Sequence, residues 1–94
     1  MTDRGDHERE IAVQQRALAA RQRNLAARDA DEHGRALHLR AAALHDEAAL
    51  VHDHIADVFD AHENPDLTES ERVAIVGEAV RVLDRVTARR PRLR

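Results

Sequence analysis

Residues 35–62 read RALHLRA AALHDEA ALVHDHI ADVFDAH, a run of consecutive segments of seven residues. Within this run, positions step by four and three along one stripe: Leu37, Ala41, Leu44, Ala48, Val51, Ile55, Val58 and His62. Such spacing predicts an amphipathic helix over residues 35–62 whose stripe packs against another helix. The pattern indicates architecture and gives no chemistry.

A second helix is predicted upstream, over about residues 7–31, with Asp6 as its N-cap. Its leucines, Leu18 and Leu25, repeat every seven residues beside alanines. At 100° per residue they lie roughly 140° from the stripe of residues 35–62, so a break over residues 29–34 is the simpler interpretation. The alternative is one straight helix over residues 7–62, about 84 Å long, plus a short antiparallel helix.

The position of the break has two competing indications. Gly34 could end the first helix in a left-handed conformation. Asp29 with Glu32 could instead cap the start of the second helix. The two indications overlap, and the sequence leaves both open.

Charge is segregated along the chain. Every charged residue between 11 and 28 is an arginine, whereas residues 45–71 contain Asp and Glu but no arginine. Residues 81–94 are again rich in arginine. Folding back near residues 29–34 would bring Arg21 and Arg23 toward Asp46 and Glu47, and Arg16 toward Asp53. Exposed ion pairs of this kind contribute at most about 1 kcal/mol each, so they select the antiparallel orientation more than they stabilise it.

A third helix is predicted over residues 68–90, after a loop over residues 63–67. Asn64 and Pro65 end the preceding helix, and Thr68 with Glu71 forms a capping box. Two apolar seams follow on this helix: Val73, Val76, Val80 and Leu83, and then Ile75, Ala79, Val82 and Val86. Residues 91–94 form a basic tail. The predicted fold is a single all-α domain, an antiparallel helical hairpin plus a third helix.

Self-association is expected from composition. The chain has 94 residues, 43% of them apolar, but alanine dominates that fraction and Phe59 is the single aromatic residue. A thin core of this kind gains stability by oligomerisation, and we expect a homo-oligomer, a dimer in the first instance, or else a separate protein partner. The expected interface is Leu37, Leu44, Val51, Ile55, Val58, Phe59, Val73, Val76, Val80 and Leu83.

Histidines are the most distinctive polar feature. His38, His45 and His52 are spaced seven apart beside the stripe, where a half-buried amphipathic ring is useful for packing. An alternative hypothesis is a transition-metal site shared by two copies, with ligands His45, His52, His54, Asp57 and His62. A further alternative is pH sensing, because protonation would add charge where helices pack.

Other functional classes have little support in the sequence. Ser70 is the single serine and lies in the capping segment, and no glycine-rich phosphate loop is present, so an enzyme is not expected. The net charge of −3 and the lack of stacking aromatics argue against nucleic-acid binding, which remains an alternative through the arginine faces. The chain lacks cysteine and any apolar run of membrane-spanning length. We expect a cytoplasmic interaction or scaffold module without a cofactor, and the all-arginine basic complement indicates a GC-rich bacterial source.

Overall fold

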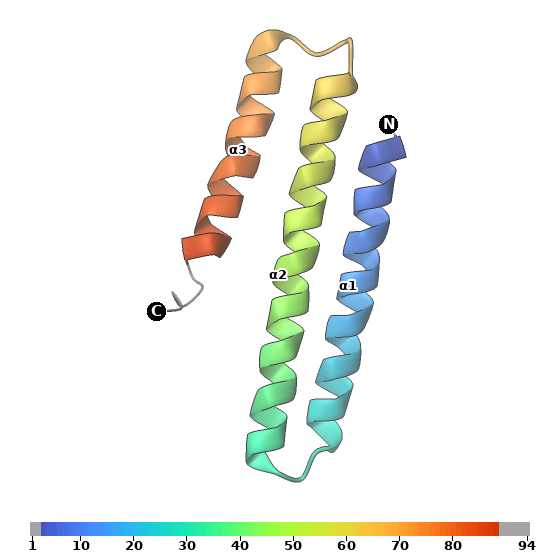
Figure 1. Cartoon of the computed structure of the whole chain (residues 1–94), viewed down its shortest axis with the longest axis vertical. Coiled ribbons are helices and arrows are strands. Elements are labelled where there is room, and N and C mark those ends of the chain that lie inside the picture. The colour runs from blue at the N-terminus through green and yellow to red at the C-terminus, as the bar shows by residue number, and fades with distance from the viewer. Residues whose placement is uncertain (1–2, 89–94) are drawn as a thin grey trace.

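The computed structural model describes residues 3–88 and places three α-helices in that range, with no strand there. They are α1 (Asp3–Arg28), α2 (Glu32–Glu63) and α3 (Glu69–Ala88). In Figure 1, α1 runs down, α2 runs up and α3 runs down, in one flat layer with α2 in the middle. The molecule measures 54 × 31 × 18 Å. The predicted all-α hairpin with a third helix is confirmed.

The break between the first two helices spans only residues 29–31, so the alternative of one continuous helix is wrong. Asp31 is the N-cap of α2, and its carboxylate accepts a hydrogen bond from the Gly34 backbone N–H at 2.9 Å. The carboxylate of Asp29 accepts one from the Asp31 N–H at 2.9 Å. Capping by Asp31 starts α2 at residue 32, three residues before the predicted start, and α1 ends at Arg28 instead of residue 31.

Gly34 does not end a helix. It lies in the first turn of α2, and no glycine in the described range has a positive φ. Its backbone N–H donates to the carboxylate of Asp31, so Gly34 belongs to a helix start. The capping residue is Asp31, in place of the predicted pair of Asp29 and Glu32, because Glu32 is already the first residue of α2. The predicted N-cap at Asp6 is also wrong, because α1 already begins at Asp3 and Asp6 lies in its first turn. Acids in that turn favour the positive end of the helix dipole.

The contact between α1 and α2 is made by residues with the smallest side chains. On α1 the buried positions are Gly5, Ala12, Ala19 and Ala26, and on α2 they include Ala42, Ala49 and Ala56. These alanines are at most 3% exposed. Because each set repeats every seven residues, the two helices touch along their whole shared length. Gly5 extends the contact, since a Cβ at this position would collide with the side chain of Asp60.

The leucine stripe of α1 does not make this contact. Leu18 and Leu25 are 41% and 38% exposed, although the alanines that directly follow them, Ala19 and Ala26, are buried. Small side chains allow two helix backbones to approach closely, whereas leucines at the contact would hold the helices further apart. The alanines therefore form the packed stripe of the hairpin.

The connection to α3 follows the prediction in position and differs in conformation. Asn64 caps the end of α2 with an extended backbone, φ −86° and ψ 110°, in place of the left-handed conformation. The capping box is confirmed: the Glu71 N–H donates to the Thr68 hydroxyl at 3.1 Å, and the Thr68 N–H donates to the Glu71 carboxylate at 3.0 Å. The backbone and side-chain hydrogen bonds with Thr68 lower the pKa of Glu71.

One of the two predicted seams of α3 faces α2. Ala79, Val82 and Val86 are buried and Ile75 is half-buried, whereas the seam that begins at Val73 is open. Arg72 ties the start of α3 to the end of α2, because its guanidinium donates to the Ala61 carbonyl at 3.1 Å and to the Asn64 carbonyl at 2.7 Å. The last residues of the predicted third helix, 89–90, and the basic tail over residues 91–94 lie outside the described residues.

The alanine contact makes a direct prediction for the variant Ala19→Leu. A leucine at this fully buried position must push α1 away from α2, and overpacking of this kind costs about 1–3 kcal/mol in the free energy of unfolding. Ala20→Leu is the matched control, because Ala20 is exposed on the same helix turn. Urea denaturation measures both variants, and equal stability of the two would contradict the assigned contact.

Candidate interaction surface

Two polar ladders run along the hairpin, one on each side of the alanine contact. The first consists of His38, His45 and His52 on α2, each paired with a polar side chain of α1. Their Nδ1 atoms lie 2.8 Å from Gln22 Oε1, 2.7 Å from Gln15 Oε1 and 2.5 Å from Glu8 Oε2, respectively. Each partner atom is an oxygen, so each of these hydrogen bonds forms when the ring carries a proton on Nδ1. This set of pairs is called the histidine ladder.

The histidine ladder confirms the half-buried position that the sequence predicted for the rings, since all three are intermediate in exposure. What the sequence analysis missed is the partner on α1. Gln15 and Gln22 are spaced seven apart, in antiparallel step with the histidines, and Glu8 continues the series. This seven-residue spacing, equal to that of the histidines, was the feature of the sequence from which the pairing could have been predicted.

The second ladder is made of ion pairs. Arg16 pairs with Asp53 and Arg23 pairs with Asp46, as the charge segregation predicted, while Arg21 and Glu47 are not the partners. Arg9 adds a third rung with Asp60 at 2.5 Å and also contacts Asp57 at 3.3 Å. The hydrogen bond that Arg9 donates to the carboxylate of Asp60 is the largest cause of a raised pKa for Arg9.

The two ladders lie on opposite sides of the layer. Along α1, Arg16 stands three residues before Ala19 and Gln22 stands three after it, which places them about 60° to either side of the alanine. One side of the hairpin is therefore held by ion pairs, and the other by imidazole, amide and carboxylate groups.

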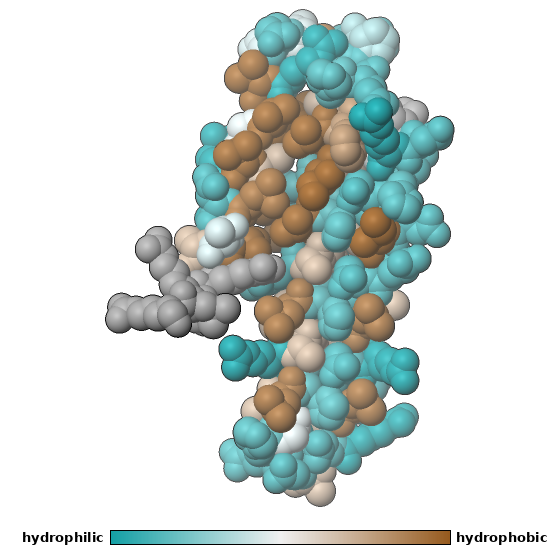
Figure 2. Space-filling model, viewed as in Figure 1, coloured by the Kyte–Doolittle hydropathy of each residue, from teal (hydrophilic) through white to brown (hydrophobic). Residues whose placement is uncertain are grey.

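The side with the histidine ladder also carries a set of large apolar side chains, while Val13, Leu39 and Leu50 are exposed outside this set. We call this the apolar face, defined as the interface set predicted above: Leu37, Leu44, Val51, Ile55, Val58, Phe59, Val73, Val76, Val80 and Leu83. None of these residues is buried, and Val73, Leu37 and Leu44 are 63%, 54% and 52% exposed. Figure 2 shows apolar surface gathered over α2 and α3 and continuing along α2 toward its N-terminal end.

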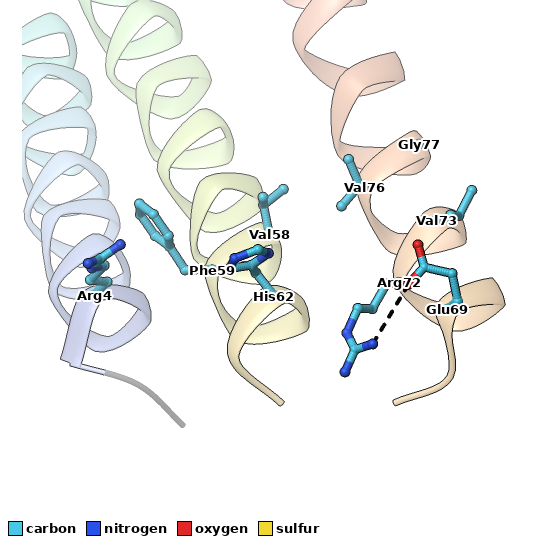
Figure 3. A pocket seen from close by; sticks show the side chains of 9 residues that line it. All are labelled: Arg4, Val58, Phe59, His62, Glu69, Arg72, Val73, Val76 and Gly77. Atoms are coloured by element: carbon cyan, nitrogen blue, oxygen red, sulfur yellow. Dashed lines mark ion pairs between the residues drawn. The ribbon is translucent and has the colours of Figure 1, made fainter. Parts of the chain in front are cut away.

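An open groove of about 750 Å³ lies at one end of the apolar face, between α2 and α3. Val58 and Phe59 line it from α2, and Val73 and Val76 line it from α3 (Figure 3). Arg4 stands at the rim with its guanidinium carbon 5.7 Å from the centre of the Phe59 ring, a cation–π contact. The groove is thus an apolar depression with a polar rim.

The residues of the metal hypothesis are not gathered in one chain. His45 and His52 are engaged in the histidine ladder, and the His54 Nδ1 lies 2.9 Å from the Leu50 carbonyl of its own helix. Asp57 contacts Arg9, and His62 lines the groove. Over residues 3–88, no three His, Asp or Glu side chains are placed to hold one ion. A site shared between two copies stays a prediction.

Comparison with known proteins returned no match to a protein-family model, to a curated protein or to a solved structure. Over the described range, no helix has both the length and the apolar content that a bilayer crossing requires. Function is therefore argued from the surface itself.

The ion-pair ladder makes a prediction for charge reversal. Arg16→Asp faces Asp53 with a like charge and should lower the free energy of unfolding by about 1 kcal/mol, because the Arg16 side chain is half exposed and that of Asp53 is one-third exposed. The double variant Arg16→Asp with Asp53→Arg should recover most of that loss. Thermal unfolding of the cycle at low salt measures the coupling, and strictly additive effects would show that the rung contributes nothing.

Proposed function

We propose that this chain is a non-enzymatic, cytoplasmic helical interaction module that binds a second copy of itself through the apolar face. The observation that carries the proposal is that small apolar side chains are buried while many of the large ones are exposed. Every buried apolar residue in the described range is alanine or valine, whereas leucines such as Leu37 and Leu44 are more than half exposed. A chain whose large apolar side chains point outward gains most by covering them.

The dimensions of the molecule favour the same conclusion. The radius of gyration is 16.5 Å, compared with about 12 Å for a compact domain of this length. A flat layer buries little surface of its own, and small domains with thin cores are commonly completed by association. Stacking a second layer on the apolar face would turn a single sheet of helices into a two-layer bundle with a core.

The face is large enough for a stable dimer. The layer offers a surface of 54 × 31 Å, and a standard interface buries about 800 Å² on each partner. Roughly half of the layer would therefore suffice. Large aliphatic side chains at the centre and charged side chains at the edges are the usual composition of such an interface.

We expect Leu44→Glu to abolish self-association, because it places a carboxylate within the apolar face. Val13→Glu is the matched control: Val13 is 63% exposed but lies on the opposite side of α1 from Gln22 of the histidine ladder, about 180° around the helix, and so away from the apolar face. Analytical ultracentrifugation over a concentration series measures both variants against the unchanged chain.

The expected result is a dimer for the unchanged chain and for Val13→Glu, and a monomer for Leu44→Glu with its helical circular dichroism retained. A monomer for the unchanged chain at all concentrations would overturn the proposal. Dissociation by Val13→Glu alone would place the interface on another surface.

A second candidate function is sensing of mild acid or of a metal ion, and the position of the histidine ladder beside the apolar face favours it. Protonation of His45, which faces the neutral Gln15, would introduce charge at the edge of an interface that excludes water, whereas His52 faces the carboxylate of Glu8. Nucleic-acid binding has weaker support, because Arg16 and Arg23 are already neutralised by Asp53 and Asp46.

The triple variant His45→Gln, His52→Gln, His54→Gln separates scaffold from sensor. For a scaffold, we expect the variant to sediment as the unchanged chain does, because glutamine preserves size and hydrogen bonding. For a sensor, the unchanged chain dissociates between pH 7.5 and pH 5.5 or on addition of Zn²⁺, and the variant loses that response with its helicity intact. Identical sedimentation of the unchanged chain under all of these conditions eliminates the sensor.

A further inference from the structure

Resting on the proposed self-association, we propose that two copies stack their apolar faces with the α2 helices antiparallel. In this arrangement, the α3 helix of each copy covers the N-terminal half of α2 in the other. The inference specifies which surface of the partner meets Leu37 and Leu44.

The first observation is that α3 accompanies only part of α2. Helix α3 has 20 residues and α2 has 32. The contacts of α3 fall on the C-terminal half of α2, from His54 to Asn64. Figure 1 shows α3, as far as Ala88, beside the end of α2 that leads into it. Leu37 and Leu44, the most exposed leucines of the apolar face, belong to the other half.

The open residues of α3 offer the complementary surface. Val73, Val76 and Val80 are 63%, 37% and 49% exposed, and the first two line the groove together with Val58. Leu37 and Leu44 stand whole heptads before Val58 and so lie on the same side of α2. Each chain thus has an uncovered leucine pair at one end of its face and an uncovered valine row at the other.

Two flat layers can stack face to face about a two-fold axis in only two principal orientations. An axis along the helices keeps α2 parallel to its copy and places α3 over the partner's α1, so that Leu37 and Leu44 meet only their own copies. An axis across the helices reverses α2 and moves each α3 to the end that the other copy leaves uncovered. Only the second orientation covers the leucine pair with the valine row.

The second, independent observation is the place of the histidine ladder. It lies between the apolar stripe of α2 and helix α1, so it is off-centre on the face. An axis along the helices would lay this polar strip over the groove between the partner's α2 and α3, where Val58, Phe59 and Val76 offer no hydrogen bonds. An axis across the helices lays polar strip on polar strip, which keeps the buried polar groups satisfied.

The register follows from complete overlap of the α2 stripes. Overlap of residues 37–62 with the reversed copy sets Leu44 opposite Ile55 of the second copy and Val51 opposite Ala48. At this register Val76 of one copy lies at the level of Leu44 of the other. Two Leu44 residues are then displaced by eleven positions, about 16 Å along the helix, too far for a disulfide.

Disulfide trapping tests the orientation, and the chain is suited to it because it contains no cysteine. The variants Leu44→Cys, Ile55→Cys and Val76→Cys are purified separately, mixed in pairs, equilibrated and oxidised. Leu44→Cys mixed with Ile55→Cys, and Leu44→Cys mixed with Val76→Cys, should each give a disulfide dimer. Leu44→Cys alone and Val76→Cys alone should stay at least tenfold less cross-linked. Ala20→Cys, exposed on α1, is the control for random collision.

Efficient cross-linking of Leu44→Cys to itself would show the parallel orientation and overturn the inference while leaving self-association intact. A retained dimer without a trapped pair in any mixture would also overturn it. A monomer in sedimentation for the unchanged chain would instead overturn the proposed function.

A second measurement leaves the face unaltered, in case the cysteines themselves weaken association. A nitroxide label on Ala30→Cys lies in the exposed turn between α1 and α2. In the antiparallel stack the two labels occupy opposite ends of the dimer, on the order of the 54 Å length of the molecule apart. In the parallel stack they are neighbours. A short label distance in pulsed electron resonance would overturn the inference.

Discussion

The close approach of α1 to α2 through glycine and alanine is the constraint on which the rest of the structure depends. Helices that meet through such small residues leave no room between them for leucine. The larger apolar side chains are consequently displaced to the flanks of the hairpin, where Leu18, Leu25, Leu37 and Leu44 are all exposed. The hairpin is well defined by geometry and poorly stabilised by burial.

The polar ladders follow from the same approach. When backbones are close, the positions three residues before and after each alanine come within reach of the opposite helix, and long side chains there can bridge. Arginine with aspartate fills one flank, and histidine with glutamine or glutamate fills the other. Each of these pairs contributes little to the free energy of folding, because it is partly exposed to water. Together they favour the antiparallel over the parallel arrangement of the two helices. Orientation is specified by polar groups, and contact by alanine.

Much of this fold was predictable from period alone. The capping box of Thr68 and Glu71 and the cap of α2 at Asn64 follow from local patterns. The pairs of Arg16 with Asp53 and Arg23 with Asp46 follow from the segregation of charge once the two helices fold back on each other. The choice of packed stripe was not predictable in the same way, because alanine and leucine both repeat every seven residues and propensity does not distinguish them. Only the distance between two helices decides which stripe is inside.

The candidate surface, too, was predictable from the sequence only in part. Its residues were identified from the sequence as an apolar set, but their exposure in the single chain depends on α3 taking its other seam, that of Ala79 and Val82, against α2. The partners of the histidines could not be assigned before the register of the hairpin was known. A shift of α1 by one heptad would exchange Gln15 for Gln22 opposite the same ring without violating any local rule.

That near-equivalence of registers has a structural consequence. The alanine contacts, the ion pairs and the histidine pairs all recur every seven residues. Each helix of the hairpin is therefore a series of similar seven-residue repeats. The three-residue turn over residues 29–31 fixes the register of the two helices, because it is too short to let one helix slide past the other. Removing or inserting seven residues in both helices at once would leave the remaining ion pairs and histidine pairs in register. The length of this hairpin is therefore free to change in steps of about 10 Å without redesign of its contacts.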